Sequence, residues 1–94
     1  MIFVMIARQV FYEGRVQGVG FRYTVKRIAM GFEVVGEVRN LADGRVELKA
    51  GGDEEEVIAF LEAIGESELA GNIRRSDVHV IPPLEGARGF EITF

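Results

Sequence analysis

Apolar residues recur with helical spacing in two segments of the chain. Phe21, Val25 and Ile28 fall four and then three positions apart, as on one face of a helix, and Gly31 is a natural residue to end that helix. A second stripe is made of Val57, Phe60, Leu61 and Ile64. The spacing therefore predicts two amphipathic helices.

The start of the second helix has its own signal. Gly51 and Gly52 are expected to break the chain, and Asp53 followed three residues later by Glu56 predicts a capping box. Residues 65–73 after this helix are expected to form a loop or a frayed helix end.

Short runs of apolar and β-branched residues predict the strands. These runs cover about residues 6–13, 32–40, 46–50, 76–80 and 90–94. Val46, Leu48 and Ala50 alternate with other residues, as in a half-buried strand, and the Asp43-Gly44 turn signal makes residues 32–51 a hairpin.

The order of these elements is strand, helix, strand, strand, helix, strand, with a short terminal strand. This order is typical of the ferredoxin-like α+β sandwich (βαββαβ), in which two helices cover one face of an antiparallel sheet. A chain of 94 residues suits one core, so we expect residues 1–94 to form a single domain. Because this fold serves many unrelated functions, the function must be argued from a site.

Composition narrows the class of protein. The chain is 48% hydrophobic and 28% charged, which is typical of a soluble globular protein. It contains no cysteine, which excludes a disulfide framework and a thiolate nucleophile and fits a reducing compartment, so we expect a cytoplasmic protein. The formal net charge of -4 argues against a nucleic-acid partner, although it allows a local positive pocket.

The apolar start of the chain, MIFVMIA, does not predict membrane association. It is too short for a membrane span and lacks the basic start and cleavage site of a signal peptide. We expect it to lead into the first strand. Translation that starts at Met5, leaving the first residues ragged, is the alternative.

The stretch GRVQGVGFR, residues 14–22, joins the first strand to the first helix and is a candidate anion site. Backbone N–H groups at a helix N-terminus bind anions, and Gly14, Gly18 and Gly20 allow the chain to aim several of them at one point. Arg22 would add a planar fork of donors suited to phosphate oxygens. The residues alone leave a second interpretation open, a glycine-rich turn beside a surface arginine.

Outside residues 14–22, polar residues give weaker indications of a catalytic or binding site. Asn40 closes a strand before the turn, where asparagine is often a turn former, but its amide could also hold a water at the anion site. His79 is expected to be a structural strand residue, Glu54–Glu56 a solvated helix start, and Arg74–Arg75 a solvent-facing pair. The serines have no visible base partner.

The sequence resembles the acylphosphatase family. The resemblance is carried by GRVQGVGFR at residues 14–22, GEVRNLADGRVE at residues 36–47 and the closing GFEI at residues 89–92. The two longer motifs are in the family's order, and the resemblance covers nearly the full chain.

The resemblance implies an enzyme that hydrolyses acyl phosphates to a carboxylate and inorganic phosphate, without metal or cofactor. The family's substrate-binding arginine corresponds to Arg22, and its water-orienting asparagine to Asn40. Its phosphate-binding loop corresponds to Arg15, Val16, Gln17, Gly18, Val19 and Gly20.

Two departures from the family pattern affect the expected pocket rim. Glu37 stands where the family often has an aromatic residue, and residues 66–76 lack the usual Gly-Pro pattern.

We expect a free enzyme that is a monomer. Two other functions remain as alternatives: a non-catalytic phosphate or carbamoyl-phosphate binding module, and a ferredoxin-like RNA-binding or regulatory domain. Phe11 and Tyr12 could suit an RNA reader, but no basic surface accompanies them.

Overall fold

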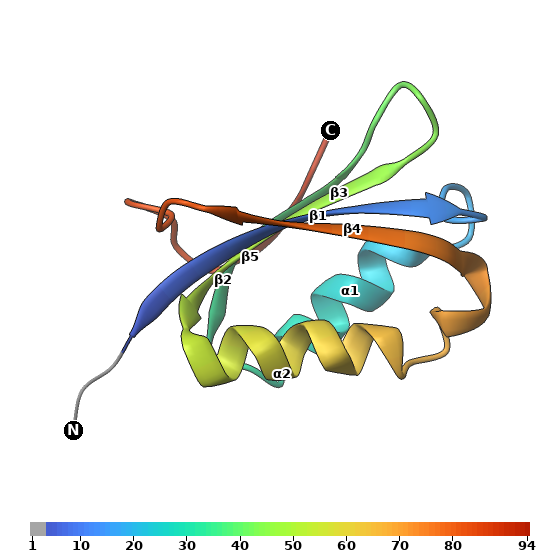
Figure 1. Ribbon diagram of the computed structural model, residues 1–94. Coiled ribbons are helices and arrows are strands. Elements are labelled where there is room, and N and C mark those ends of the chain that lie inside the picture. The colour runs from blue at the N-terminus through green and yellow to red at the C-terminus, as the bar shows by residue number, and fades with distance from the viewer. Residues whose placement is uncertain (1–3) are drawn as a thin grey trace.

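The structure, a computed structural model, describes residues 4–94 and has five strands and two α-helices in that range (Figure 1). The strands are β1 (Met5–Gly14), β2 (Val34–Asn40), β3 (Val46–Asp53), β4 (Ile73–Ile81) and β5 (Phe90–Thr93). The helices are α1 (Phe21–Ala29) and α2 (Glu54–Gly65), followed by a 3₁₀ turn, η1 (Ala70–Asn72). The expected elements and their order are confirmed, while the choice between translation starts concerns residues outside the described range.

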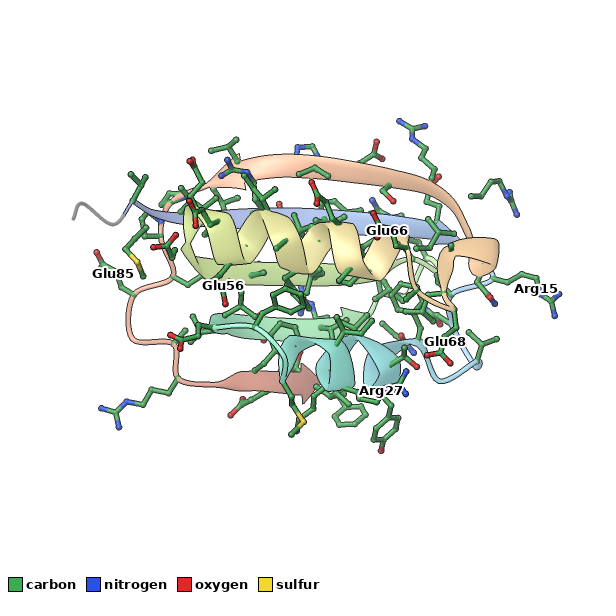
Figure 2. The ribbon with its side chains drawn as sticks, turned by 90° about the horizontal axis from the view of Figure 1, so that it is seen from below. Arg15, Arg27, Glu56, Glu66, Glu68 and Glu85 are labelled. Atoms are coloured by element: carbon green, nitrogen blue, oxygen red, sulfur yellow. The ribbon has the colours of Figure 1, made fainter. Side chains whose placement is uncertain are left out.

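The strands form one sheet in the order β4-β1-β3-β2-β5, and both helices lie against the same face (Figure 1). The contacts β1–β3, β1–β4 and β2–β3 are antiparallel, but β5 runs parallel to β2, so the expectation of a wholly antiparallel sheet is wrong. The reason is directional: the chain must reverse after β4, and β2 already runs in the reversed direction. Figure 2 shows Glu85 in the connection that carries the chain from β4 to β5 across one end of the sheet.

The hydrophobic core lies between the sheet and the helices. Val46, Leu48 and Ala50 of β3 are fully buried there, as their alternation predicts. Helix α1 packs over β2 and β5, and α2 packs over β1 and β3. The Phe60 ring of α2 contacts the Phe90 ring edge-on, with centroids 5.6 Å apart. None of the helices formed by residues 4–94 combines the length and the apolar character needed to cross a bilayer.

The start of α2 differs from the expectation in two ways. Gly51 and Gly52 do not break the chain but continue β3, and Leu84 packs 3.3 Å from the point where a Gly51 side chain would begin. Asp53 caps the helix by accepting a hydrogen bond from the Glu55 N–H, 3.0 Å away. The capping box is wrong because the Glu56 carboxylate instead accepts the Glu33 N–H, 2.8 Å away.

The end of α1 lies where the sequence predicts, with Met30 as its last capping residue before Gly31. Gly31 does not take the left-handed conformation common after helices. Its N–H and that of Phe32 instead donate to the carbonyl groups of Ile28 and Ala29, in tight turns.

Candidate active site

Residues 15–20 form a loop between β1 and α1 that is anchored at its beginning. The Arg15 N–H donates to the Asn72 carbonyl, 2.9 Å away, and the Asn72 side chain donates back to the Arg15 carbonyl at 3.0 Å. The Val16 side chain is buried in the core, with 1% of its surface exposed. The Arg15 side chain points away from the body of the protein (Figure 2). The backbone bonds of Arg15 to Asn72 and the buried side chain of Val16 therefore hold the start of the loop in place.

The rest of the loop presents backbone donors. Within residues 4–94, no protein acceptor is found for the N–H groups of residues 16–23, and the first bond of α1 runs from the Thr24 N–H to the Gly20 carbonyl at 3.0 Å. Gly18 and Gly20 adopt left-handed conformations, with φ of 75° and 78°, which turn the chain into the helix. The α1 N-terminus has no side-chain cap, so its positive dipole end is open to an anion.

Arg22 lies in the first turn of α1, next to these donors. Its guanidinium carbon lies 5.0 Å from the centre of the Phe94 ring, a cation–π contact. No hydrogen bond or ion pair occupies its donors in the part of the chain that the structure describes, which leaves the fork available to an anion. The aromatic contact does not neutralise the charge of the guanidinium.

Asn40 ends β2 at the same end of the sheet. Its side chain lies on the same face of the strand as Val38, which is fully buried under the helices. Its Oδ1 atom is buried and has no hydrogen-bond partner within residues 4–94. Buried polar groups normally have a partner, so this atom calls for a water molecule or a ligand.

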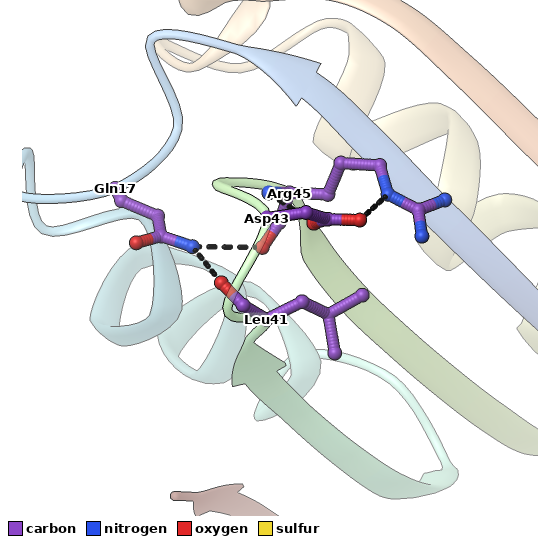
Figure 3. A network of polar contacts seen from close by, with 4 residues as sticks. All are labelled: Gln17, Leu41, Asp43 and Arg45. Atoms are coloured by element: carbon purple, nitrogen blue, oxygen red, sulfur yellow. Dashed lines mark hydrogen bonds and ion pairs between the residues drawn. The ribbon is translucent and has the colours of Figure 1, made fainter.

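The β2–β3 turn is bonded to the loop of residues 15–20 next to Asn40. The Gln17 amide donates to the Leu41 carbonyl at 2.8 Å and to the Arg45 carbonyl at 2.9 Å (Figure 3). Because Leu41 directly follows Asn40, these two bonds connect the candidate water site to the candidate anion site.

The opposite face of the sheet supports this region with a buried charge. Glu47 of β3 is only 6% exposed and accepts hydrogen bonds at 2.7 Å from both Arg39 and Gln9. Burial alone would raise the pKa of Glu47. The hydrogen bonds from these two partners, with the charges of Arg39 and Lys49, outweigh burial and hold that pKa below its ordinary value.

The remaining residues considered from the sequence lie apart from the loop. His79 is exposed on the open face of β4, edge-on to Phe11 at 5.7 Å between ring centroids. Arg74 and Arg75 are exposed as expected, and Arg75 pairs with Asp77. Tyr12 faces the core rather than the open face, against Phe21.

The two departures from the family pattern have different positions. Glu37 lines a cleft of about 630 Å³ on the open face, together with Lys49 and residues 83–89. None of residues 15–20 lines that cleft. The segment 66–76, in contrast, supplies Asn72 to the loop and pairs Glu68 with Arg27 of α1 (Figure 2).

Three contributors to the site have no local sequence signal. Asn72, Phe94 and the bond pattern of Gln17 depend on contacts between distant segments, which only the folded register reveals. The shared strand end of Asn40 and the loop, in contrast, follows from the predicted topology.

Comparison with known proteins gives the same assignment as the motifs. The sequence model of the family described as Acylphosphatase matches residues 8–92. The acylphosphatase of Bacillus velezensis is 39% identical over 90 residues, which is 96% of this chain and 100% of that protein. The acylphosphatase of Archaeoglobus fulgidus is 37% identical over 90 residues, with the same coverage of both chains.

Solved structures show the same similarity. The crystal structure of the acylphosphatase from Bacillus subtilis superposes with a TM-score of 0.86 and 36% identity, covering 95% of this chain and 99% of that one. Full-length HypF, in a phosphate- and nucleotide-bound form, gives a TM-score of 0.85 and 27% identity over all of this chain and 12% of HypF. The match over nearly the whole length, in sequence and in fold, shows that this chain belongs to the acylphosphatase family of hydrolases.

Proposed function

We propose that the chain hydrolyses acyl phosphates at the loop of residues 15–20, with Arg22 and Asn40 as its catalytic residues. The family acts on small acyl phosphates, and the geometry at this end of the sheet suits that chemistry. The observation that carries the proposal is the run of backbone donors at residues 16–23, which leads into a helix N-terminus with Arg22 in its first turn.

The loop and Arg22 hold the phosphoryl group. Backbone N–H groups from Val16 to Gly20 donate to its oxygens. The guanidinium of Arg22 stabilises the negative charge that these N–H groups leave uncompensated. Phosphoryl transfer depends mainly on positioning and on stabilising charge on the equatorial oxygens, which these donors supply. The side chains of Val16 and Gln17 serve as anchors, so contact with phosphate comes from the backbone there.

Asn40 orients the attacking water. Its amide group holds a water molecule so that the water oxygen approaches phosphorus opposite the acyl oxygen, in line with the bond that breaks. The buried Oδ1 atom without a protein partner supports this role, because a water proton would satisfy it.

Each electron pair and proton has a destination in this step. The water oxygen forms a bond to phosphorus, and the phosphorus–oxygen bond to the acyl group breaks with its electrons on the carboxylate. A carboxylate has a conjugate acid of pKa about 4, so it leaves without a general acid. A phosphate oxygen accepts the water proton. His79 lies on the open face of the sheet, and we assign it no part in the transfer.

The test is the initial rate of benzoyl phosphate hydrolysis, without added metal and with a chelator present. The unsubstituted protein is compared with Arg22→Ala and Asn40→Ala, after circular dichroism shows that all three are folded. We expect each substitution to lower kcat/KM by at least about 100-fold, the usual cost of removing a preorganised donor. Unchanged rates in either variant would remove that residue from the mechanism.

A binding module is the second candidate function, and the similarity to part of HypF favours it. Such a module would bind phosphate or carbamoyl phosphate without turnover. A folded protein that binds inorganic phosphate but does not hydrolyse benzoyl phosphate would support this alternative over the enzyme.

We also propose that the chain acts as a monomeric single domain in the cytoplasm and binds no nucleic acid. The buried side chains form one hydrophobic cluster, which supports a single domain. The absence of cysteine and the net charge of -4 support the compartment and the lack of a nucleic-acid partner. Analytical ultracentrifugation at several concentrations tests the oligomeric state.

A further inference from the structure

Gln17 makes an unusual contact for an exposed side chain. Its single Nε2 atom donates to two carbonyl oxygens, those of Leu41 at 2.8 Å and Arg45 at 2.9 Å (Figure 3). An exposed glutamine normally gains little by ordering its side chain, since water satisfies the amide equally well. Two short bonds to one small turn indicate a defined position.

The two acceptors are the residues that close the β2–β3 turn. The Leu41 N–H donates to the Arg45 carbonyl at 2.8 Å, and the Gly44 N–H donates to the Leu41 carbonyl at 3.1 Å. Asp43 braces the same turn by accepting from the Arg45 backbone at 3.1 Å and from its side chain at 2.9 Å. The turn is therefore closed and braced by its own hydrogen bonds, and Gln17 donates to a carbonyl at each of its ends.

This contact sets the spacing between the two halves of the site. The bonds from Gln17 are the ones that join residues 15–20 to residues 40–46 among the hydrogen bonds of the described chain. Asn40 directly precedes Leu41, so a shift of the turn relative to the loop moves the Asn40 amide relative to bound phosphate. A shift of about 1 Å in a reacting group can cost on the order of 100-fold in rate.

We propose that Gln17 is a positioning residue: its two bonds hold Asn40, and the water on it, in line with the phosphorus of a substrate in the loop. This role rests on the proposed function of Asn40. It differs from phosphate binding, because the Gln17 amide is directed at the turn and its acceptors are backbone carbonyls.

A double-mutant cycle between Gln17 and Asn40 tests the role. Gln17→Met keeps the length of the side chain and removes its donor. We expect this variant to lower kcat for benzoyl phosphate by about 10-fold, and to change the inhibition constant of inorganic phosphate by less than about two-fold. In the Asn40→Ala background the same substitution should change kcat by less than about two-fold, because there is no oriented water left to misplace.

Asn72→Ala is the matched control. Asn72 also donates from an exposed part of the structure to a loop carbonyl, but at Arg15 and away from the turn. Its effect on kcat should multiply with that of Asn40→Ala, since the two act separately. Gln17→Asn, which is too short to reach both carbonyls, should reproduce the kcat loss and replaces Gln17→Met if methionine prevents folding.

The outcomes separate the two proposals. Coupling between positions 17 and 40 with phosphate inhibition unchanged supports the positioning role. Multiplicative effects, or a loss confined to phosphate inhibition, would overturn it while leaving the enzyme in place. An unsubstituted protein that is folded but inactive would overturn the proposed function, and the positioning role with it.

Discussion

At the scale of single residues, Glu47 shows how the central strand tolerates a buried charge. It is flanked by Arg39 from β2 and Gln9 from β1, and each of its oxygens accepts a hydrogen bond at 2.7 Å. A buried carboxylate is costly unless it is paired and hydrogen-bonded, and here both conditions are met. Its position opposite Arg39, one residue before Asn40, places this network directly behind the site.

We predict that Glu47→Gln lowers the free energy of unfolding by about 1–3 kcal/mol at pH 7, because an amide leaves one of the two donors without an acceptor. The pKa of Glu47 is lower in the folded state than its ordinary value of 4.5, so its contribution to stability is present above that pH. The contribution is lost as pH falls through the folded-state pKa, so the difference between the two proteins should narrow below about pH 4.5.

Urea unfolding between pH 3 and pH 7 measures this difference. Glu91→Gln is the control, since Glu91 is exposed on β5 and makes no hydrogen bond through its side chain within residues 4–94, and its effect should stay within about 0.5 kcal/mol. Equal stabilities of the two variants at pH 7 would contradict the role of the network.

The sequence could not predict this network, although it predicted the alternation around it. Val46 and Leu48 mark the core face of β3, and Glu47 between them would ordinarily face water. Its burial depends on which residues stand opposite on β1 and β2, and this register is not encoded in the spacing of any one strand. For the same reason the sequence pointed to Gln17 as a loop residue but not to its contact with the turn.

At the scale of elements, the strand-to-helix connection is built on backbone conformation. Gly20 precedes α1 with φ of 78°, and the space where its side chain would lie is open for 4 Å. Steric clash with neighbours therefore does not explain the glycine. Its reason is the left-handed backbone that directs the N–H groups of the helix start.

We predict that Gly20→Ala lowers stability by about 1–2 kcal/mol through backbone strain. Because relief of that strain moves the backbone donors, kcat/KM should also fall by at least about 10-fold. Gly65→Ala is the control at the end of α2, where the space is equally open and φ is not positive; it should be neutral or stabilise by up to about 1 kcal/mol. Thermal melts and benzoyl phosphate assays measure both effects, and full activity in Gly20→Ala would rule out a role for the conformation.

Elements were predicted well where periodicity was strong and less well where glycine stood inside them. The stripes that begin at Phe21 and Val57 correctly predict both helices, but Gly51 and Gly52, which were expected to break the chain, are residues of β3. Leu84 fills the space above Gly51, so packing from a distant segment overrides the local preference of glycine. The Glu56 carboxylate likewise accepts a hydrogen bond from the Glu33 N–H of a distant segment, instead of completing the expected capping box.

At the scale of the whole molecule, β4 is the edge strand opposite to β5 and leaves an apolar strip in contact with water. Val78 and Val80 are 56% and 77% exposed. Exposed apolar edge strands pair with other chains unless charge or strand shape prevents it. The basic pair Arg74–Arg75 protects one half of β4, and the other half has no such protection.

We predict that Val80→Lys slows aggregation during heating, because a charge on the edge opposes pairing with another chain. Activity should stay within about two-fold, since β4 contributes no residue to the proposed site. Met30→Lys adds the same charge at an apolar residue that is 81% exposed at the end of α1, away from a sheet edge. Light scattering should show slower aggregation for Val80→Lys alone, and an equal effect of both variants would point to net charge instead.

The topology also sets when the protein becomes active during its synthesis. Residues 5–14 lie between β3 and β4, and the loop that follows them is bonded to Asn72. A nascent chain that has extended only as far as α2 already contains the loop, Arg22 and Asn40. It still lacks β4, which completes the pairing of β1, and Asn72, whose side chain bonds to the loop. Phosphate binding should therefore appear as a late, single event, once residues up to 81 are free to fold.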